Sequence, residues 1–441
     1  MRKFLVLGSW FFVPRSWFRV LVCSLVVQTT VFSEQPSTKN QEPGTGAAEP
    51  FRPEAGKFPP SEKAYIYEGE LVSVDHVNRR GSLRVSANGA FYGINPTPFA
   101  MLPYGSIRHH GAPAELDDIP LHTFLHVRAF LPPDPKTSVV PVLPVNNKDV
   151  VAFGMGKHYP PENHVMLLED EPSHCLREGL VWKLREVDLN KEENLLLASR
   201  EPRQGGDTKA TPEKLTFDAA TRFWRGRECF SLQEWIAEGH WPAEGKKTLE
   251  GEPVLLGLTW KPTPGGIFTR FHVSDIWLDE TSIQRAAHNQ TETHKAFIRS
   301  HWMPAWVDSV EYGKFARATV TVTLFGGMDP SLYADFKKGT EVVINGAENT
   351  LRHAGGGVGP SHMASKGPLL EITKASGDIP LGSSGIQIRF ETNLIIEAIR
   401  PTRVVRIRPA TWRNVMLPPE ETIGDQADPG RRFPTPAIFQ K

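Results

Sequence analysis

The sequence lacks the short motifs that identify the common catalytic sites. It contains no HExxH pair of a metalloprotease, no five-residue GxSxG elbow and no phosphate loop of the order GxxxxGK followed by Ser or Thr. The acidic run at residues 169–171 is expected to be a solvated loop. Nothing in the sequence places two carboxylates across a cleft, as a glycosidase requires. We therefore predict no catalytic residue and no cofactor.

Cysteine and net charge are limited as well. Lys plus Arg and Asp plus Glu each number 50, and this neutrality argues against a general polyanion-binding protein, including one for nucleic acid. Only three cysteines occur, and only Cys175 and Cys229 lie beyond the N-terminal segment. An exported protein can pair such residues, so two alternatives stay open: one Cys175–Cys229 disulfide, or two free, buried thiols.

Long apolar runs are absent, but residues 1–33 have the composition of a secretory signal peptide. Arg2 and Lys3 precede a first apolar patch, and the uncharged apolar run at residues 20–32 ends before Ser33. This run is shorter than the about 20 apolar residues that span a bilayer. The sequence therefore predicts a cleaved signal at residues 1–33, with a retained anchor as the alternative, and a mature protein that is periplasmic or extracellular.

Glycine and proline are abundant, at 37 and 38 residues, and they favour many short strands joined by turns. Residues 34–62 are polar and rich in Pro, Gly and Glu, which predicts a disordered linker. Residues 410–441 are irregular and contain several turn-forming Pro and Gly residues, which predicts an extended tail. Folded structure is expected between these two segments.

One pattern recurs three times within the predicted folded part. An alternating strand ends in Val and an acidic residue, and a polar turn and a second alternating strand follow. The acids are Asp75, Asp188 and Glu311, which lie 113 (188 − 75) and 123 (311 − 188) residues apart. A shorter echo, Asp-Ile-Pro-Leu, precedes an alternating strand at residues 118–121 and 378–381. These spacings indicate a tandem array of small β units.

The middle unit carries the most regular signal. Residues 214–218 and 221–226 are expected to be strands around a turn, and residues 231–236, followed by Gly239, a short helix with a glycine stop. With the remaining strands, the order is strand, strand, strand, short helix, strand, strand, which is that of a five-stranded OB barrel. Beyond this unit, the capping-box spacing of Thr281 and Gln284 predicts a connector helix.

The fold class that follows is mainly β: tandem small OB-like β barrels with one connector helix. The expected boundaries are OB-like unit 1 at residues 63–160, barrel 2 at 161–280, the connector helix at 281–304 and OB-like unit 3 at 305–409.

Three segments resemble those of uncharacterised exported β-barrel-repeat proteins from planctomycete-type bacteria. They are TRFWRGR at residues 221–227, HGAPAELDDIPL at 110–121 and MPAWVD at 303–308. The resemblance covers most of residues 64–416. It implies an exported location and a lineage, and it implies no activity and no functional residue.

Arginine alternates with aromatic residues at one place in the middle unit. Arg222, Trp224, Arg225 and Arg227 lie on or beside its expected third strand. OB barrels bind oligonucleotides or oligosaccharides on the face of strands 2 and 3, and aromatic side chains with Arg form stacking platforms there. The alternative is that Trp224 fills the barrel and the arginines are solvated or paired with acids.

Histidines offer only weak signals for a metal. His294 and His301 lie seven residues apart on one face of the connector helix, without further ligands at metal-binding spacing. The alternative is that these side chains contact a neighbouring barrel. His109 and His110 are expected in a solvent-exposed loop, and His174 next to Cys175 is expected to point away from it.

Three functions are compatible with these features. The first is an exported, non-enzymatic binding or structural module of the cell envelope. The second is an extracellular polysaccharide- or polymer-binding protein that uses the Trp224–Arg225 face. The third is an exported hydrolase with a site assembled from dispersed residues. The expected partner is an envelope component or an extracellular polymer, and membrane contact is expected only through an uncleaved signal segment.

Overall fold

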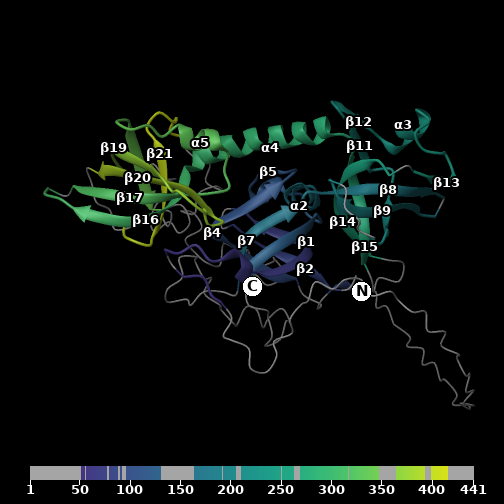
Figure 1. Ribbon diagram of the computed structural model, residues 1–441, viewed down its shortest axis with the longest axis horizontal. Coiled ribbons are helices and arrows are strands. Elements are labelled where there is room, and N and C mark those ends of the chain that lie inside the picture. Colours follow the sequence, from purple (N-terminus) through teal and green to yellow (C-terminus); the bar gives the residue numbers. More distant parts are fainter. Residues whose placement is uncertain are drawn as a thin grey trace, which may run out of the picture. The chain divides into compact units, whose positions relative to one another are not determined.

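Alternation of apolar and polar residues along the chain forms strands, and the strands close into three small barrels in tandem (Figure 1). The computed structural model describes residues 51–415, apart from 55, 77–78, 88–89, 92–95, 131–162, 191, 205–209, 250, 263–268, 316, 347–363 and 393–398. The described residues belong to one compact unit. The predicted fold class, tandem small β barrels with a connector helix, is confirmed.

The first barrel has five main strands. β1 pairs with β2 and β6, β2 with β4, and β7 closes the barrel between β6 and β4. The β4–β7 pair is parallel and the others are antiparallel. The elements are η1 (Ser61–Lys63), β1 (Tyr65–Asp75), β2 (Arg80–Ala87), β3 (Ala90–Phe91), β4 (Thr97–His109), β5 (Ala112–Pro113), η2 (Leu116–Asp118), β6 (Phe124–Phe130) and β7 (Asn163–Asp170).

The second barrel repeats this order. β8 pairs with β9 and β14, β9 with β10, and β15 lies between β14 and β10. Its third strand is split into β10 and β11, which both run parallel to β15. The elements are α2 (Glu171–Glu178), β8 (Leu180–Leu189), β9 (Asn194–Pro202), β10 (Glu213–Phe217), β11 (Arg222–Arg225), β12 (Glu228–Phe230), α3 (Leu232–Ala237), β13 (Gly245–Thr248), β14 (Pro253–Pro262) and β15 (Thr269–Trp277).

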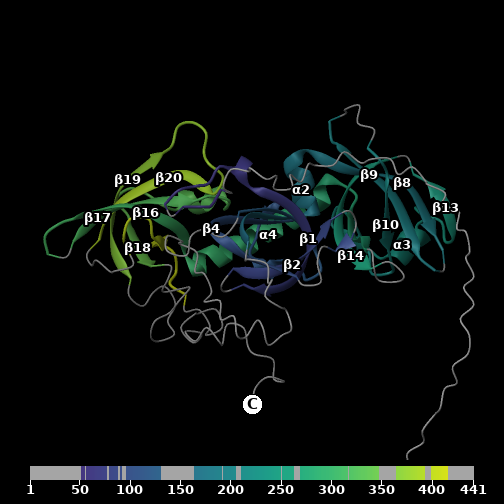
Figure 2. The same cartoon turned by 90° about the horizontal axis from the view of Figure 1, so that it is seen from below.

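The third barrel closes with six strands, all antiparallel, in the order β16-β17-β20-β19-β18-β21 (Figure 2). This order differs from that of the other two barrels. The elements are β16 (Met303–Tyr312), β17 (Ala318–Phe325), α5 (Pro330–Ala334), β18 (Glu341–Gly346), β19 (Ser365–Lys374), β20 (Ser383–Thr392) and β21 (Val404–Pro409).

The threefold pattern in the sequence corresponds to the first hairpin of each barrel. The pairs β1–β2, β8–β9 and β16–β17 are antiparallel, and each has a register shift centred three residues before the pattern's acid (75 − 72, 188 − 185 and 311 − 308). The shifts lie at Val72, Arg185 and Asp308. A bulge bends a strand and increases its twist, which a small barrel needs in order to close. The Asp-Ile-Pro-Leu echo is not equivalent, because β6 pairs with the first strand of its barrel and β20 with the second.

Two expectations for the middle of the chain are corrected. The boundary at residues 160 and 161 is wrong, because β7 completes the first barrel and the second begins with β8. The strands at residues 214–218 and 221–226 exist, but they do not form a hairpin. They are β10 and β11, both parallel to β15, and the turn after β11 leads into its antiparallel partner β12.

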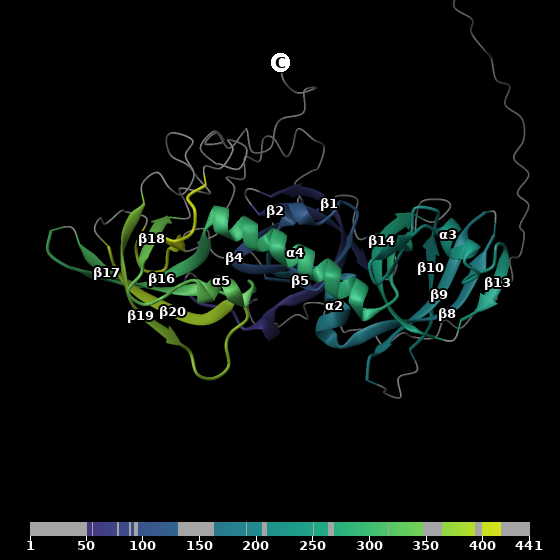
Figure 3. The same ribbon diagram turned by 90° about the horizontal axis from the view of Figure 1, so that it is seen from above.

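The connector helix is α4 (Glu280–His301), so its expected end at residue 304 lies three residues too late (Figure 3). Its N-cap is Asp279, whose side chain accepts a hydrogen bond from the Ser282 backbone, so the expected start at Thr281 is wrong by two residues. The helix contacts β5 of the first barrel and β11 and β15 of the second. Ile298 near its end packs in the core of the third barrel. α4 therefore touches all three barrels.

The predicted linker ends earlier than residue 62. Phe51 and Phe58 pack in an apolar cluster that joins the first barrel to the third. The Phe58 ring lies 5.3 Å from that of Tyr104 on β4 and 4.7 Å from that of Trp306 on β16. Gly382, directly before β20, packs against the same Tyr104 ring. It has φ +91°, and a Cβ there would lie 2.7 Å from Tyr104 Cδ2. Sequence composition missed this segment because prolines surround its two apolar anchors.

The extended tail begins later than residue 410. Trp412 is buried in the core cluster of the third barrel, and its indole N–H donates to Asp335 at 2.9 Å. Arg408 in turn donates to the Trp412 carbonyl at 2.7 Å. The remaining residues of the predicted tail, 416–441, lie outside the described residues, as does the predicted signal at 1–33.

The aromatic cluster around Phe58 leads to a prediction for stability. Phe58→Ala should lower the free energy of unfolding by about 2–4 kcal/mol, because it removes ring contacts with both barrels. Phe315→Ala is the matched control, since its ring is 93% exposed and its loss should cost less than about 0.5 kcal/mol. Urea denaturation measures both variants. Equal midpoints for the two would show that the segment does not stabilise the fold.

Candidate functional site

The predicted ligand face lies on β11 and the turn that follows it. Phe223, and not Trp224, fills the barrel: Phe223 is fully buried and stacks on Trp235. Trp224 is half-buried, and its indole N–H donates to Asp275 Oδ1 at 2.8 Å. Arg222 is exposed and pairs with the same carboxylate at 2.8 Å. Strand alternation thus places Arg222 and Trp224 on the outer side of the barrel.

Arg225 lies over a second aromatic group. Its guanidinium is 4.9 Å from the ring centre of Phe230 and 5.4 Å from that of Trp235. The same group pairs with Glu238 at 3.2 Å. Arg227 is exposed. Arg222 and Trp224 therefore lie on one side of β11, whereas Arg225 lies on the other side with Phe230 and Trp235, so the predicted Trp224–Arg225 face is divided. Both Arg222 and Arg225 already have acidic partners within the barrel.

The acidic run Glu169–Asp170–Glu171 is not a solvated loop. All three side chains are buried, at the point where β7 ends and α2 begins. Asp170 is the N-cap of α2, because its Oδ1 accepts a hydrogen bond from the Ser173 backbone at 2.9 Å. An acidic N-cap followed by Pro172 in the first turn is a helix-start signal, and this signal in the sequence was missed.

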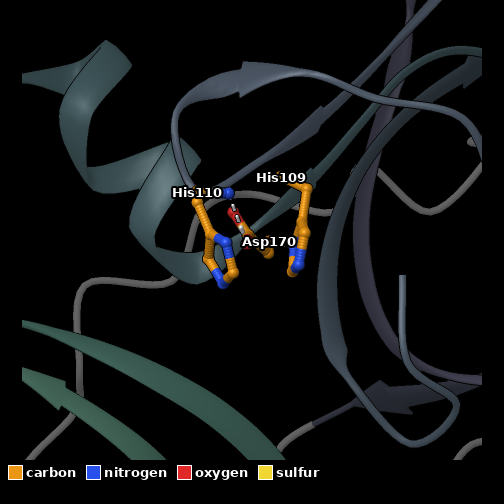
Figure 4. A group of neighbouring side chains, drawn as sticks. All are labelled: His109, His110 and Asp170. Carbon is orange, nitrogen blue, oxygen red and sulfur yellow. Dashed lines mark hydrogen bonds and ion pairs between the residues drawn. The ribbon is translucent and has the colours of Figure 1, made fainter. Parts of the chain in front are cut away.

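Asp170 also binds two histidines of the first barrel (Figure 4). His109 Nδ1 lies 2.7 Å from Asp170 Oδ2, and the His110 backbone N–H donates to the same oxygen at 2.9 Å. Burial raises the pKa of Asp170, but His109 and His110 outweigh it and hold that pKa well below its usual range. Burial, helped by the charge of His109, lowers the pKa of His110 to about 4. The two imidazole rings are 3.7 Å apart.

The expected exposure of these histidines is therefore corrected. His109 is buried at the end of β4, and His110 is half-buried in the following turn. His109, His110 and Asp170 each offer one ligand atom, and these atoms all lie within 4.8 Å of one another. Within the described part of the chain, this is the one group of three or more such side chains at metal-ligand separation.

Glu171 joins the first barrel to the second. It is fully buried, and it accepts hydrogen bonds from Trp182 Nε1 at 2.7 Å and Arg200 Nε at 3.0 Å in the second barrel. Its other oxygen lies 2.6 Å from Nε2 of His126 on β6 of the first barrel. Burial raises its pKa, but Arg200 and His126 outweigh it and lower the pKa to about 2. The carboxylate is therefore ionised and fully partnered inside the junction.

The two cysteines are free, so the disulfide alternative is wrong. Cys175 is buried on α2, and its Sγ donates to Glu171 Oε1 at 3.1 Å. Burial and the Glu171 charge raise the pKa of this thiol well above its usual range. Cys229 lies on β12 and is exposed. The alternative of two buried thiols is therefore correct only for Cys175. The neighbours His174 and Cys175 lie on a helix and not on an extended segment.

The two weak metal candidates on α4 have separate partners. His294 is buried, and its Nε2 lies 3.5 Å from Glu115 of the first barrel. The His301 ring stacks on Phe297 at 3.8 Å, and its Nδ1 lies 3.0 Å from the Phe297 carbonyl. The alternative prediction, that histidines of this helix contact a neighbouring barrel, therefore holds for His294.

A small recess with a volume of about 30 Å³ lies among the first barrel, α4 and the third barrel. Its charged lining residues are Arg79, Glu115 and Arg406. Burial raises the pKa of Glu115, but Arg79 and His294 outweigh it and lower the pKa to about 2. Burial and the charge of Arg79 lower the pKa of Arg406 to about 10. Two guanidinium groups therefore face one carboxylate, which leaves the recess with a net positive charge.

Neither a protein-family model nor a curated protein sequence matches this chain. Among the described residues, no helix is long and apolar enough to cross a membrane.

The His126–Glu171 contact makes stability depend on pH. Burial lowers the pKa of His126, but the bonds to Glu171 and Glu68 outweigh it and raise the pKa from 6.5 to about 9. This contribution to stability is therefore full below pH 6.5 and is lost as pH rises through about 9. The free energy of unfolding should fall across that range. A folded His126→Gln variant should lack this loss, and a wild-type curve that is parallel to that of the variant would contradict the assignment.

Proposed function

We propose that this chain is an exported, non-catalytic β-barrel protein that serves as a binding or structural module of the cell envelope. The observation that carries the proposal is the Glu171 junction, where a buried carboxylate binds groups from two barrels. Domains joined by small interfaces usually move relative to one another, whereas the Glu171 carboxylate is fully buried and bonded to groups of both barrels. Buried junctions between barrels suit a protein that presents several surfaces as one unit.

Two further features support a location and a partner. The composition of residues 1–33 supports export, and these residues lie outside the described part of the chain. Zero net charge favours an envelope component or an extracellular polymer over nucleic acid as the partner.

Export can be tested with the full chain in a bacterial host. We expect the protein in the periplasm or medium, with a mass that corresponds to loss of residues 1–33. A variant with Leu25→Arg and Val26→Arg interrupts the apolar run and should stay in the cytoplasm at full mass, because a signal needs that run. Wild-type protein found in the cytoplasm with residues 1–33 intact would overturn the export proposal.

A second candidate function is polymer binding through the side of β11 that carries Arg222 and Trp224. The observation that favours it is that Phe223 fills the barrel, which leaves Trp224 half-buried beside an exposed Arg222. An indole at the surface offers a flat apolar area for a sugar ring, and the nearby guanidinium groups offer hydrogen-bond donors.

Trp224→Ala tests this second candidate. Retention on insoluble peptidoglycan should fall roughly tenfold, since one aromatic contact contributes about 1.4 kcal/mol to such a complex. The variant should stay folded, because Phe223 and not Trp224 fills the barrel, although loss of the hydrogen bond to Asp275 should lower the melting temperature by a few degrees. Tyr312→Ala is the control, as an exposed aromatic of the third barrel. Unchanged retention of a folded Trp224→Ala variant would exclude this face.

A further inference from the structure

We propose that His109, His110 and Asp170 bind one divalent transition-metal ion of the zinc type. The three side chains come from the end of β4, the turn after it and the end of β7. Figure 4 shows the three residues side by side, with Asp170 bonded to the ring of His109 and to the backbone N–H of His110. Two imidazole nitrogens and one carboxylate oxygen form a ligand set that suits Zn²⁺ and its neighbours and suits Mg²⁺ or Ca²⁺ poorly.

The backbone of the turn brings the two rings together. Successive side chains of a strand point to opposite faces, so neighbouring histidines on a continuous β4 would diverge. His110 instead adopts a left-handed conformation, with φ +54°, which His tolerates better than most residues. The rings consequently face each other at 3.7 Å, at an angle of 30°. Backbone strain of this kind is often kept where a site needs it.

The turn is held in place without a metal. The His110 N–H donates to Asp170 Oδ2 at 2.9 Å, and the Gly111 N–H donates to Ser173 Oγ at 2.8 Å. Gly111 also has φ +83°, and a Cβ there would lie 2.6 Å from Leu176 Cδ1 of α2. The ligands are therefore organised before an ion arrives, which reduces the free-energy cost of binding.

The separation of the ligand atoms is close to that of a bound state. In a tetrahedral zinc site with bonds of about 2.1 Å, neighbouring ligand atoms lie about 3.4 Å apart. The three atoms here lie within 4.8 Å of one another. Binding of an ion therefore requires the His110 ring to turn toward the other two ligands, and a water molecule would occupy the fourth position.

The site is surrounded by both negatively and positively charged side chains. The carboxylates of Asp118 and Asp275 favour a positive charge at His109, whereas Arg222 disfavours one at His110. Arg222 is itself paired with Asp275 at 2.8 Å, which reduces its effect. The Trp277 ring of β15 packs against His110 at 5.0 Å and covers one side of the site. The local charge therefore permits a cation.

The test uses the full-length protein after treatment with a chelator. Zn²⁺ is titrated by calorimetry, and Co²⁺ is added as a spectroscopic probe whose visible absorption reports the ligand geometry. We expect one site with micromolar or tighter affinity that excess Mg²⁺ does not displace. His110→Asn removes a ligand while Asn still tolerates the left-handed backbone. His122→Asn is the matched control, since His122 has φ +72° in another turn of the same barrel.

His110→Asn should weaken Zn²⁺ binding at least about tenfold and abolish the Co²⁺ absorption of the site, while His122→Asn should behave as wild type. Asp170→Asn is the second variant, because its amide oxygen still accepts the helix-cap hydrogen bond but is a poor ligand. Folding of each variant is checked by circular dichroism. No binding of Zn²⁺ by the wild type, or equal affinity in the wild type and either folded ligand variant, would overturn the proposal.

Discussion

The buried carboxylate of Glu171 is the constraint on which the arrangement of the first two barrels depends. An ionised group inside a protein is stable only if its oxygens are fully hydrogen-bonded and its charge is compensated. Trp182, Arg200, His126 and Cys175 together meet this requirement, and they come from both barrels and from the helix between them. Separation of the barrels would take either His126 or the pair of Arg200 and Trp182 away from this charge.

The junction between the first and third barrels follows a different principle. There, Tyr104, Trp306 and Phe325 pack as an aromatic cluster, and Phe58 from the N-terminal segment completes it. Apolar contacts of this kind tolerate small adjustments that a directed set of hydrogen bonds does not. Helix α4 adds polar contacts to the same part of the molecule, since Gln290 donates to Asp118 at 2.7 Å. One chain thus uses polar and apolar junctions side by side.

The sequence predicted those parts of the molecule that depend on neighbouring residues. The first hairpins, α3, α4 and the barrel class followed from alternation, turns and caps. The buried acidic run was misread because its partners His109, His126 and Arg200 are distant in sequence, and only the fold brings them to Asp170 and Glu171. The choice between Phe223 and Trp224 as the core residue likewise depends on how β11 pairs with β15. Composition alone did not identify Phe58 as a packing residue, because prolines surround it in the sequence.

The connection from β7 through α2 to β8 contains no spacer. Asp170 is both the last residue of one barrel's final strand and the cap of the helix, and only Gly179, with φ +68°, separates that helix from the next barrel. A gene fusion or domain exchange with its boundary here would separate a buried carboxylate from some of its hydrogen-bond partners. Transfer of either barrel alone would therefore leave buried polar groups at this junction without some of their partners, although each barrel has the strand order of a fold that is elsewhere used singly.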